Sequence, residues 1–142
     1  MIKSVPDTNV LISAEHGNLN SPNREYFERW KKSEFFLLFS DDTLKEYIKK
    51  LDDFGFTDYE VAEAIAPILS LGIHVDIVHF HYKKYPTDQD DIAFILCADN
   101  GEATHLVSYD KHLLDLNGQF DFKICQTLEF LSDLRNSLED ND

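Results

Sequence analysis

The chain alternates short apolar runs with segments in which apolar and charged residues recur at helical spacing. Five segments have the length and apolar character of buried strands. They lie at residues 2–5, 35–39, 74–80, 103–109 and 120–124. Helical patterns lie between and after them, at residues 10–12, 23–33, 40–51, 57–72, 90–98, 111–116 and 128–138. Strands separated by helices pair in parallel through crossovers, so we predict an α/β fold with an open sheet.

Local signals mark where some of these helices begin and which side faces the core. Thr8 or Asn9 is expected to cap the first helix, as small polar residues favour that position. Tyr26, Phe27 and Trp30 recur at helical spacing between charged residues. We expect this aromatic stripe to pack in the core rather than to stack on nucleic-acid bases.

Length and composition indicate one ordinary globular domain. The chain has 142 residues, 43% hydrophobic and 28% charged, which excludes a largely disordered protein. We expect a single domain over 1–138 and an acidic tail over 139–142. The two cysteines, Cys97 and Cys125, are predicted to be free thiols.

The sequence shows no sign of a membrane segment or a secretion signal. No apolar run approaches the roughly 20 residues needed to span a bilayer. The opening MIKSVPDTNVLIS lacks the regions of a signal peptide. We therefore expect a cytoplasmic protein with no membrane partner.

The net charge is unusual, at -14 with 27 acidic and 13 basic residues. General electrostatic attraction to nucleic acid is therefore disfavoured. The acids either form a solvated surface or converge in part on a cation, and a basic partner is also compatible with this charge.

Four acids stand where ligands bind in open α/β sheets. Asp7 follows the first predicted strand and Asp110 the fourth, so both belong to the carboxyl edge of the sheet. Glu46 and Asp91 lie on helices near element boundaries. If the four converge, their mutual repulsion requires a cation, and oxygen donors without histidine or cysteine suit Mg²⁺ or Mn²⁺. Such ions activate water and stabilise the leaving oxygen in phosphodiester hydrolysis.

Each of these acids also has a purely structural interpretation. Asp7 and Asp110 precede short helices and are suited to cap them. Glu46 stands three residues after Thr43, which is the spacing of a capping box. Asp91, with its acidic neighbours, is suited to a helix N-terminus through the helix dipole. Spacing along the chain does not separate these interpretations from a shared site.

Three segments carry the acids in a set order along the chain. They read PDTNVLIS (6–13), FSDDTLKEYIKKL (39–51) and DQDDIAFILCADNGEATHLVSYDKHLLDL (88–116). Together they resemble the motifs of the PIN-domain nucleases, especially the VapC-like toxins of toxin–antitoxin systems. The resemblance spans nearly the whole chain.

The resemblance implies roles for particular residues. The catalytic and metal-binding acids are Asp7, Glu46, Asp91 and Asp110; the supporting hydrogen-bonding residues are Asn9 and Ser108; the auxiliary candidates are Asp88 and Asp90. The family also implies a Rossmann-like fold and Mg²⁺- or Mn²⁺-dependent endoribonuclease activity that leaves a 5′-phosphate and a 3′-hydroxyl. An RNA substrate, a cognate antitoxin and a homodimer are the partners it implies.

RNA would have to be guided past the acids by basic side chains. The candidates are Arg24, Arg29, Lys31, Lys32, Lys83, Lys84 and Lys111. Most of these are expected to be solvated surface residues.

Other functions fit the sequence less well. One alternative is a catalytically weak PIN-like module that binds RNA or protein. A phosphoryl-accepting receiver or a haloacid-dehalogenase-like enzyme is disfavoured, because the sequence around Asp7 lacks the dehalogenase pattern and the third predicted strand ends without the receiver's acid. A zinc site on His74, His79 and His81 lacks further ligands at familiar spacing.

Overall fold

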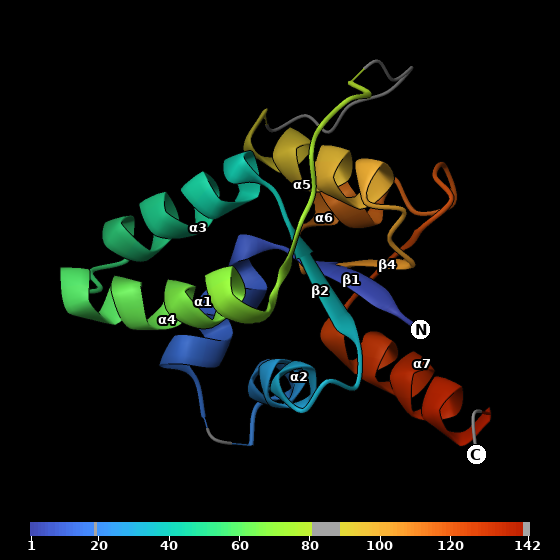
Figure 1. Cartoon of the computed structure of the whole chain (residues 1–142), viewed down its shortest axis with the longest axis horizontal. Coiled ribbons are helices and arrows are strands. Elements are labelled where there is room, and N and C mark those ends of the chain that lie inside the picture. The colour runs from blue at the N-terminus through green and yellow to red at the C-terminus, as the bar shows by residue number, and fades with distance from the viewer. Residues whose placement is uncertain (19, 81–88, 141–142) are drawn as a thin grey trace.

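The computed structural model describes residues 1–18, 20–80 and 89–140, without the side chains of 89 and 90 (Figure 1). Its strands are β1 (Lys3–Pro6), β2 (Phe36–Phe39), β3 (Ile73–His74), β4 (His105–Val107) and β5 (Lys123–Cys125). Its helices are α1 (Thr8–His16), α2 (Pro22–Lys31), α3 (Asp41–Asp53), α4 (Asp58–Leu71), α5 (Gln89–Asn100), α6 (Lys111–Leu114) and α7 (Thr127–Asp140).

The strands form one parallel sheet in the order β3-β2-β1-β4-β5. This confirms the predicted α/β fold. The chain moves outward from β1 to β2 and β3, then returns to the other side of β1 with β4 and β5. The strand order therefore reverses between β1 and β4, and ligands bind open sheets beyond the carboxyl ends of strands at such a point.

Helices cover both faces of the sheet, which agrees with the continuous apolar run of β2, FLLF. The helix α5 packs on β1, β2 and β4, and α7 packs on β4 and against α2. Figure 1 shows the sheet passing between α5 and the pair formed by α2 and α7. The aromatic stripe of α2 faces the core as expected, since Tyr26, Phe27 and Trp30 are all buried.

The predicted strand over 74–80 is wrong for most of its length. Only Ile73 and His74 pair with β2, and residues 75–80 have no regular secondary structure. The Asn100 side chain accepts hydrogen bonds from the amides of Val78 and His79, both at 2.8 Å. Because a side chain at the end of α5 accepts hydrogen bonds from these two amides, they do not require the carbonyls of a neighbouring strand as partners.

The last two strands are shorter than their apolar runs. β4 covers His105–Val107 within the predicted 103–109, and β5 covers Lys123–Cys125 rather than 120–124. Pairing with the four-residue strand β1 limits β4, and β5 in turn pairs with β4 alone. The extent of each strand is thus set by its neighbour.

The two cysteines are free, as predicted, and both are buried. Desolvation raises the pKa of the Cys97 thiol to about 12, and it does the same for Cys125. A thiol with such a pKa forms almost no thiolate near neutral pH, so neither side chain is suited to act as a nucleophile.

The C-terminal helix extends past the predicted end of the domain. The helix α7 continues through Asp140, so the first two residues of the predicted 139–142 tail are helical. The division into a domain and a tail stays a prediction. None of the helices in the described part of the chain, α7 included, is long and apolar enough to cross a membrane.

Candidate active site

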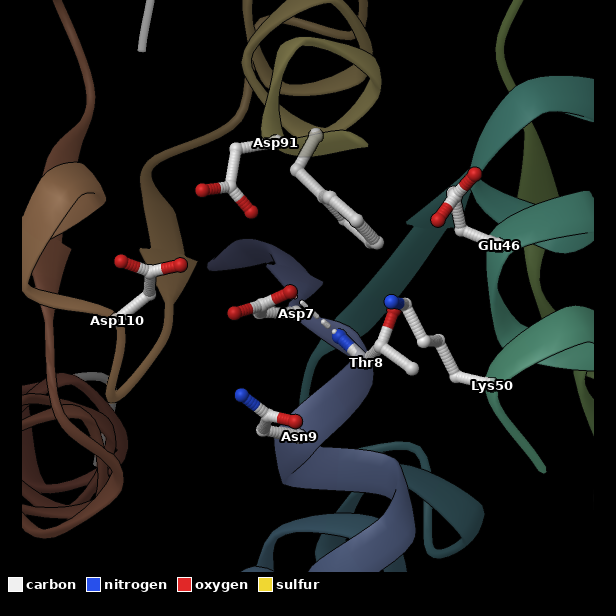
Figure 2. Close-up of a pocket in the computed structure, with 8 residues that line it drawn as sticks. Asp7, Thr8, Asn9, Glu46, Lys50, Asp91 and Asp110 are labelled. Atoms are coloured by element: carbon white, nitrogen blue, oxygen red, sulfur yellow. Dashed lines mark hydrogen bonds between the residues drawn. The ribbon is translucent and has the colours of Figure 1, made fainter. Parts of the chain in front are cut away.

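A pocket of about 130 Å³ opens at the carboxyl edge of the sheet, where the strand order reverses. Its lining contains all four predicted catalytic acids, although they are far apart in the sequence. The residues that line it are Asp7, Thr8, Asn9, Glu46, Lys50, Asp91, Phe94 and Asp110. Figure 2 shows the acids arriving from different elements around this pocket, with Asp7 near its centre.

Asp7 follows directly on the central strand β1 and is 4% exposed. Its Oδ1 accepts a hydrogen bond from the Thr8 amide at 2.7 Å, which makes it the N-cap of α1. The prediction that Thr8 or Asn9 caps this helix is therefore wrong. An aspartate can cap with one oxygen and present the other elsewhere, so capping and a place in the site are compatible here.

Ser108 joins the ends of β1 and β4 and is completely buried. Its hydroxyl donates to Asp7 Oδ2 at 2.7 Å and accepts from the Asp110 amide at 2.9 Å. One hydroxyl thus fixes the orientation of the first acid and the backbone of the last. Asn9 lies on the exposed rim of the pocket.

Asp110 is both a helix cap and a pocket residue. Its Oδ1 accepts from the His112 amide at 2.8 Å and so begins α6. The carboxylate is half-buried at the wall opposite Glu46 (Figure 2). The structural interpretation of this acid and its place at the site therefore both hold.

The capping-box interpretation of Glu46 is wrong. The box at the start of α3 is made by Ser40 and Thr43, whose side chains each take the other's amide, at 3.2 and 2.9 Å. Glu46 lies one turn further along, half-buried in the pocket wall.

Asp91 lies in the first turn of α5 and is 6% exposed. This position is also compatible with a favourable interaction with the helix dipole. Of the auxiliary candidates, Asp88 and the side chain of Asp90 lie outside the described residues.

Tyr47 supports the site from behind and was not singled out by the sequence. It is completely buried, and its hydroxyl donates to the carbonyl of Pro6, the residue before Asp7. Burial raises the pKa of this phenol well above its usual value, so the hydroxyl stays protonated. The contact holds α3 against the end of β1.

Lys50 is a second residue that sequence reasoning missed. It lines the pocket from α3, four residues after Glu46. The signal was present, because side chains four apart on a helix lie on the same face. A lysine four residues after a site acid is therefore expected to line the same pocket as that acid.

The donor set of the pocket fits a hard divalent cation. It offers four carboxylates and no histidine or cysteine, which is the chemistry preferred by Mg²⁺ and Mn²⁺. Within the described residues, no three acidic, histidine or cysteine side chains are close enough as they stand to hold a metal ion. Like charges repel, so the carboxylates would have to draw together around a cation.

Among the histidines proposed as an alternative metal site, the ring of His74 contacts carboxylates. His74 Nε2 contacts Asp41 Oδ1 at 2.8 Å, and its Nδ1 lies 3.6 Å from Asp76. The backbone of His79 is held by Asn100, and His81 lies outside the described residues.

Two of the predicted RNA-guiding bases pair with carboxylates on the surface. Arg29 contacts Glu25 and Glu34, at 2.9 and 2.7 Å. Lys111 contacts Asp115 at 2.9 Å. Lys83 and Lys84 lie outside the described residues.

Comparison with protein families agrees with this arrangement. The sequence model of the PIN domain matches residues 3–112, which include all four pocket acids. The chain belongs to the PIN-domain family. Its members are generally nucleases that use divalent metal ions. The catalytic and metal-binding roles of the individual acids in this PIN domain stay predictions.

Solved structures share the fold of this PIN domain at low sequence identity. One similar chain comes from the crystal structure of VapBC2 from Rickettsia felis bound to a DNA fragment from their promoter. The TM-score is 0.59 and the identity 13%, and the match covers 87% of this chain and 97% of that one. A search of curated proteins found no match.

Proposed function

We propose that this PIN domain is a divalent-metal-dependent endoribonuclease and the toxin of a toxin–antitoxin system. The observation that carries the proposal is the gathering of Asp7, Glu46, Asp91 and Asp110 around one pocket at the carboxyl edge of the sheet. They come from three separate segments of the chain, in a family whose members are generally nucleases. A purely structural role for each acid does not explain why all four line the same pocket.

The proposed division of roles follows the position of each acid. Asp7, Asp91 and Asp110 would hold Mg²⁺ or Mn²⁺, and Glu46 would either bind a second ion or orient the attacking water. Such a cation, when bound, would offset the negative charge of the acids and of the phosphate and make water a better nucleophile. Ser108 keeps the Asp7 carboxylate in a fixed orientation through its 2.7 Å hydrogen bond.

The proposed reaction is hydrolysis of an RNA phosphodiester. The water oxygen attacks phosphorus in line with the bond to the 3′ oxygen. That bond breaks, and the 3′ oxygen leaves as a hydroxyl after taking up a proton. The products are a 5′-phosphate and a 3′-hydroxyl. Protein side chains contribute by holding the reacting groups in line and by stabilising developing charge.

We also propose an antitoxin partner. A structural neighbour is a chain of the VapBC2 complex, and a site lined by four carboxylates attracts a basic side chain. An antitoxin would insert a helix or an extended segment beside the pocket and offer such a side chain to it. The homodimer expected from the family is part of the same proposal and is tested by light scattering of the purified protein.

The first experiment is cleavage of a pool of structured and single-stranded RNA with Mn²⁺, Mg²⁺ or a chelator. The natural protein is compared with Asp7→Asn and Asp91→Asn, and Asp53→Asn on the exposed end of α3 serves as a matched control. Asparagine caps helices as well as aspartate does, so Asp7→Asn keeps the cap of α1, while its amide nitrogen replaces the oxygen that accepts from Ser108.

The proposal predicts metal-dependent cutting by the natural protein and by Asp53→Asn, with a large loss in the two site variants. Circular dichroism and thermal unfolding confirm that the variants fold. Metal binding without any cutting by the natural protein would overturn the nuclease proposal in favour of the binding module.

A further inference from the structure

Lys50 is the one positively charged side chain among the described residues that line the acid pocket. It lies on α3, one turn after Glu46, and is half-buried. Figure 2 shows it extending from α3 toward the interior of the pocket, on the side of Thr8. Arg29 and Lys123, which do not line the pocket, contact the carboxylates of Glu25 and Glu129.

The pocket presents an electrostatic difficulty for an anionic substrate. Its four carboxylates carry four negative charges when ionised, and Lys50 offsets one of them. A single divalent cation would still leave the pocket one charge negative. A phosphodiester adds another negative charge, so a positive group inside the pocket is favourable for substrate binding.

We propose that Lys50 binds a phosphate oxygen of the RNA backbone at this site. The inference rests on the proposed nuclease function, and it adds a substrate-binding residue to it. A lysine ammonium is a compact charge with three donors on a flexible stem, which suits a non-bridging phosphate oxygen beside acidic groups. Its place on α3 puts this contact on the Glu46 side of the pocket.

The competing role for Lys50 is structural. A lysine four residues after a glutamate on a helix is spaced to pair with it, and such a pair would relieve repulsion among the acids without touching substrate. The two roles differ in what removal of the charge does. Loss of a phosphate contact weakens RNA binding and lowers its salt dependence by one contact. Loss of a charge that only neutralises the acids removes no phosphate contact, so it leaves the salt dependence unchanged and strengthens cation binding.

The test compares Lys50→Met with Lys49→Met. Lys49 is the neighbouring residue on the same helix, is exposed, and does not line the pocket. Both substitutions remove the same charge from the same element. Lys50→Arg keeps the charge and serves as a rescue variant, although its planar fork differs from an ammonium.

Binding is measured without cleavage by placing each substitution in the Asp7→Asn protein. The probe is a fluorescein-labelled single-stranded RNA of mixed sequence, followed by anisotropy in Mg²⁺ over a series of salt concentrations. We expect Lys50→Met to weaken binding by about tenfold, the effect of losing one charged hydrogen bond. The negative slope of log affinity against log salt should become shallower by about 0.7, the value for one phosphate contact on a single strand.

Lys49→Met should leave both the affinity and the slope unchanged, and Lys50→Arg should restore most of the binding. In the protein with Asp7 intact, Lys50→Met should raise the KM for the RNA pool more than it lowers kcat. Equal RNA binding by Lys50→Met and Lys49→Met would overturn the inference, and tighter Mn²⁺ binding in calorimetry would then assign Lys50 to balancing the acids.

This outcome is distinct from failure of the proposed function. If the natural protein cuts RNA and Lys50→Met binds RNA as Lys49→Met does, the inference fails alone. If the natural protein cuts no RNA with either metal, the nuclease proposal fails, and the phosphate contact proposed for its substrate falls with it.

Discussion

Ser108→Ala tests whether one buried hydroxyl organises the acid pocket. The substitution removes the donor to Asp7 Oδ2 at 2.7 Å and the acceptor for the Asp110 amide at 2.9 Å. It changes no charge and adds no bulk at a site with no exposed surface. Any effect on metal binding is therefore transmitted through the orientation of the two acids.

The expected magnitude follows from the chemistry of the two bonds. A hydrogen bond to a charged group contributes about 1.5–3 kcal/mol, and a neutral one contributes about 1 kcal/mol. We expect Ser108→Ala to lower the free energy of unfolding by about 2.5–4 kcal/mol. Loss of a group that orients a metal ligand typically weakens metal binding by about 10–100-fold, and we expect at least the lower figure for Mn²⁺.

Ser4→Ala is the matched control for this prediction. Ser4 is also completely buried, and its hydroxyl shares a 2.8 Å hydrogen bond with the Tyr26 hydroxyl, away from the pocket. We expect it to lower the free energy of unfolding by about 1 kcal/mol and to leave Mn²⁺ affinity unchanged. Urea unfolding measures the first quantity and titration calorimetry the second. The reasoning is refuted if Ser108→Ala matches Ser4→Ala in both.

Three further substitutions test other parts of the structure. Burial lowers the pKa of His105 despite its carboxylate partner, so the unfolded chain binds a proton more readily. The free energy of unfolding should therefore fall as the pH drops below about 6.5. His105→Gln should reduce the difference between the free energies measured by urea unfolding at pH 7.5 and 5.5, and an unchanged difference would contradict this prediction. Tyr47→Phe removes the donor to the buried Pro6 carbonyl. It should lower the free energy of unfolding by about 1–2 kcal/mol, and unchanged stability would count against that contact. Asn100→Ala removes the side chain that binds the backbone of Val78 and His79, so limited proteolysis should cut at these residues faster than in the natural protein.

Much of the fold follows from patterns that are local in the sequence. Apolar runs separated by amphipathic segments predicted a parallel α/β sheet, because strands covered on both faces lose their polar positions. The same logic placed Asp7 and Asp110 at the carboxyl edge of the sheet, since each directly follows a predicted strand. The same reasoning wrongly predicted a strand over 75–80, because the side chain of Asn100, distant in the sequence, accepts hydrogen bonds from two amides of this segment.

The sequence pointed to the four acids through the order of three motif segments, which resemble those of the PIN-domain family. Only the folded chain shows that these acids share a pocket, that Ser108 reaches Asp7 from 101 residues away, and that Lys50 joins them. The physical reason is that secondary structure arises from neighbouring residues, whereas a site depends on how strands pair and helices pack. Those contacts bring together side chains that are distant in the sequence, and no local sequence pattern specifies the distances between them.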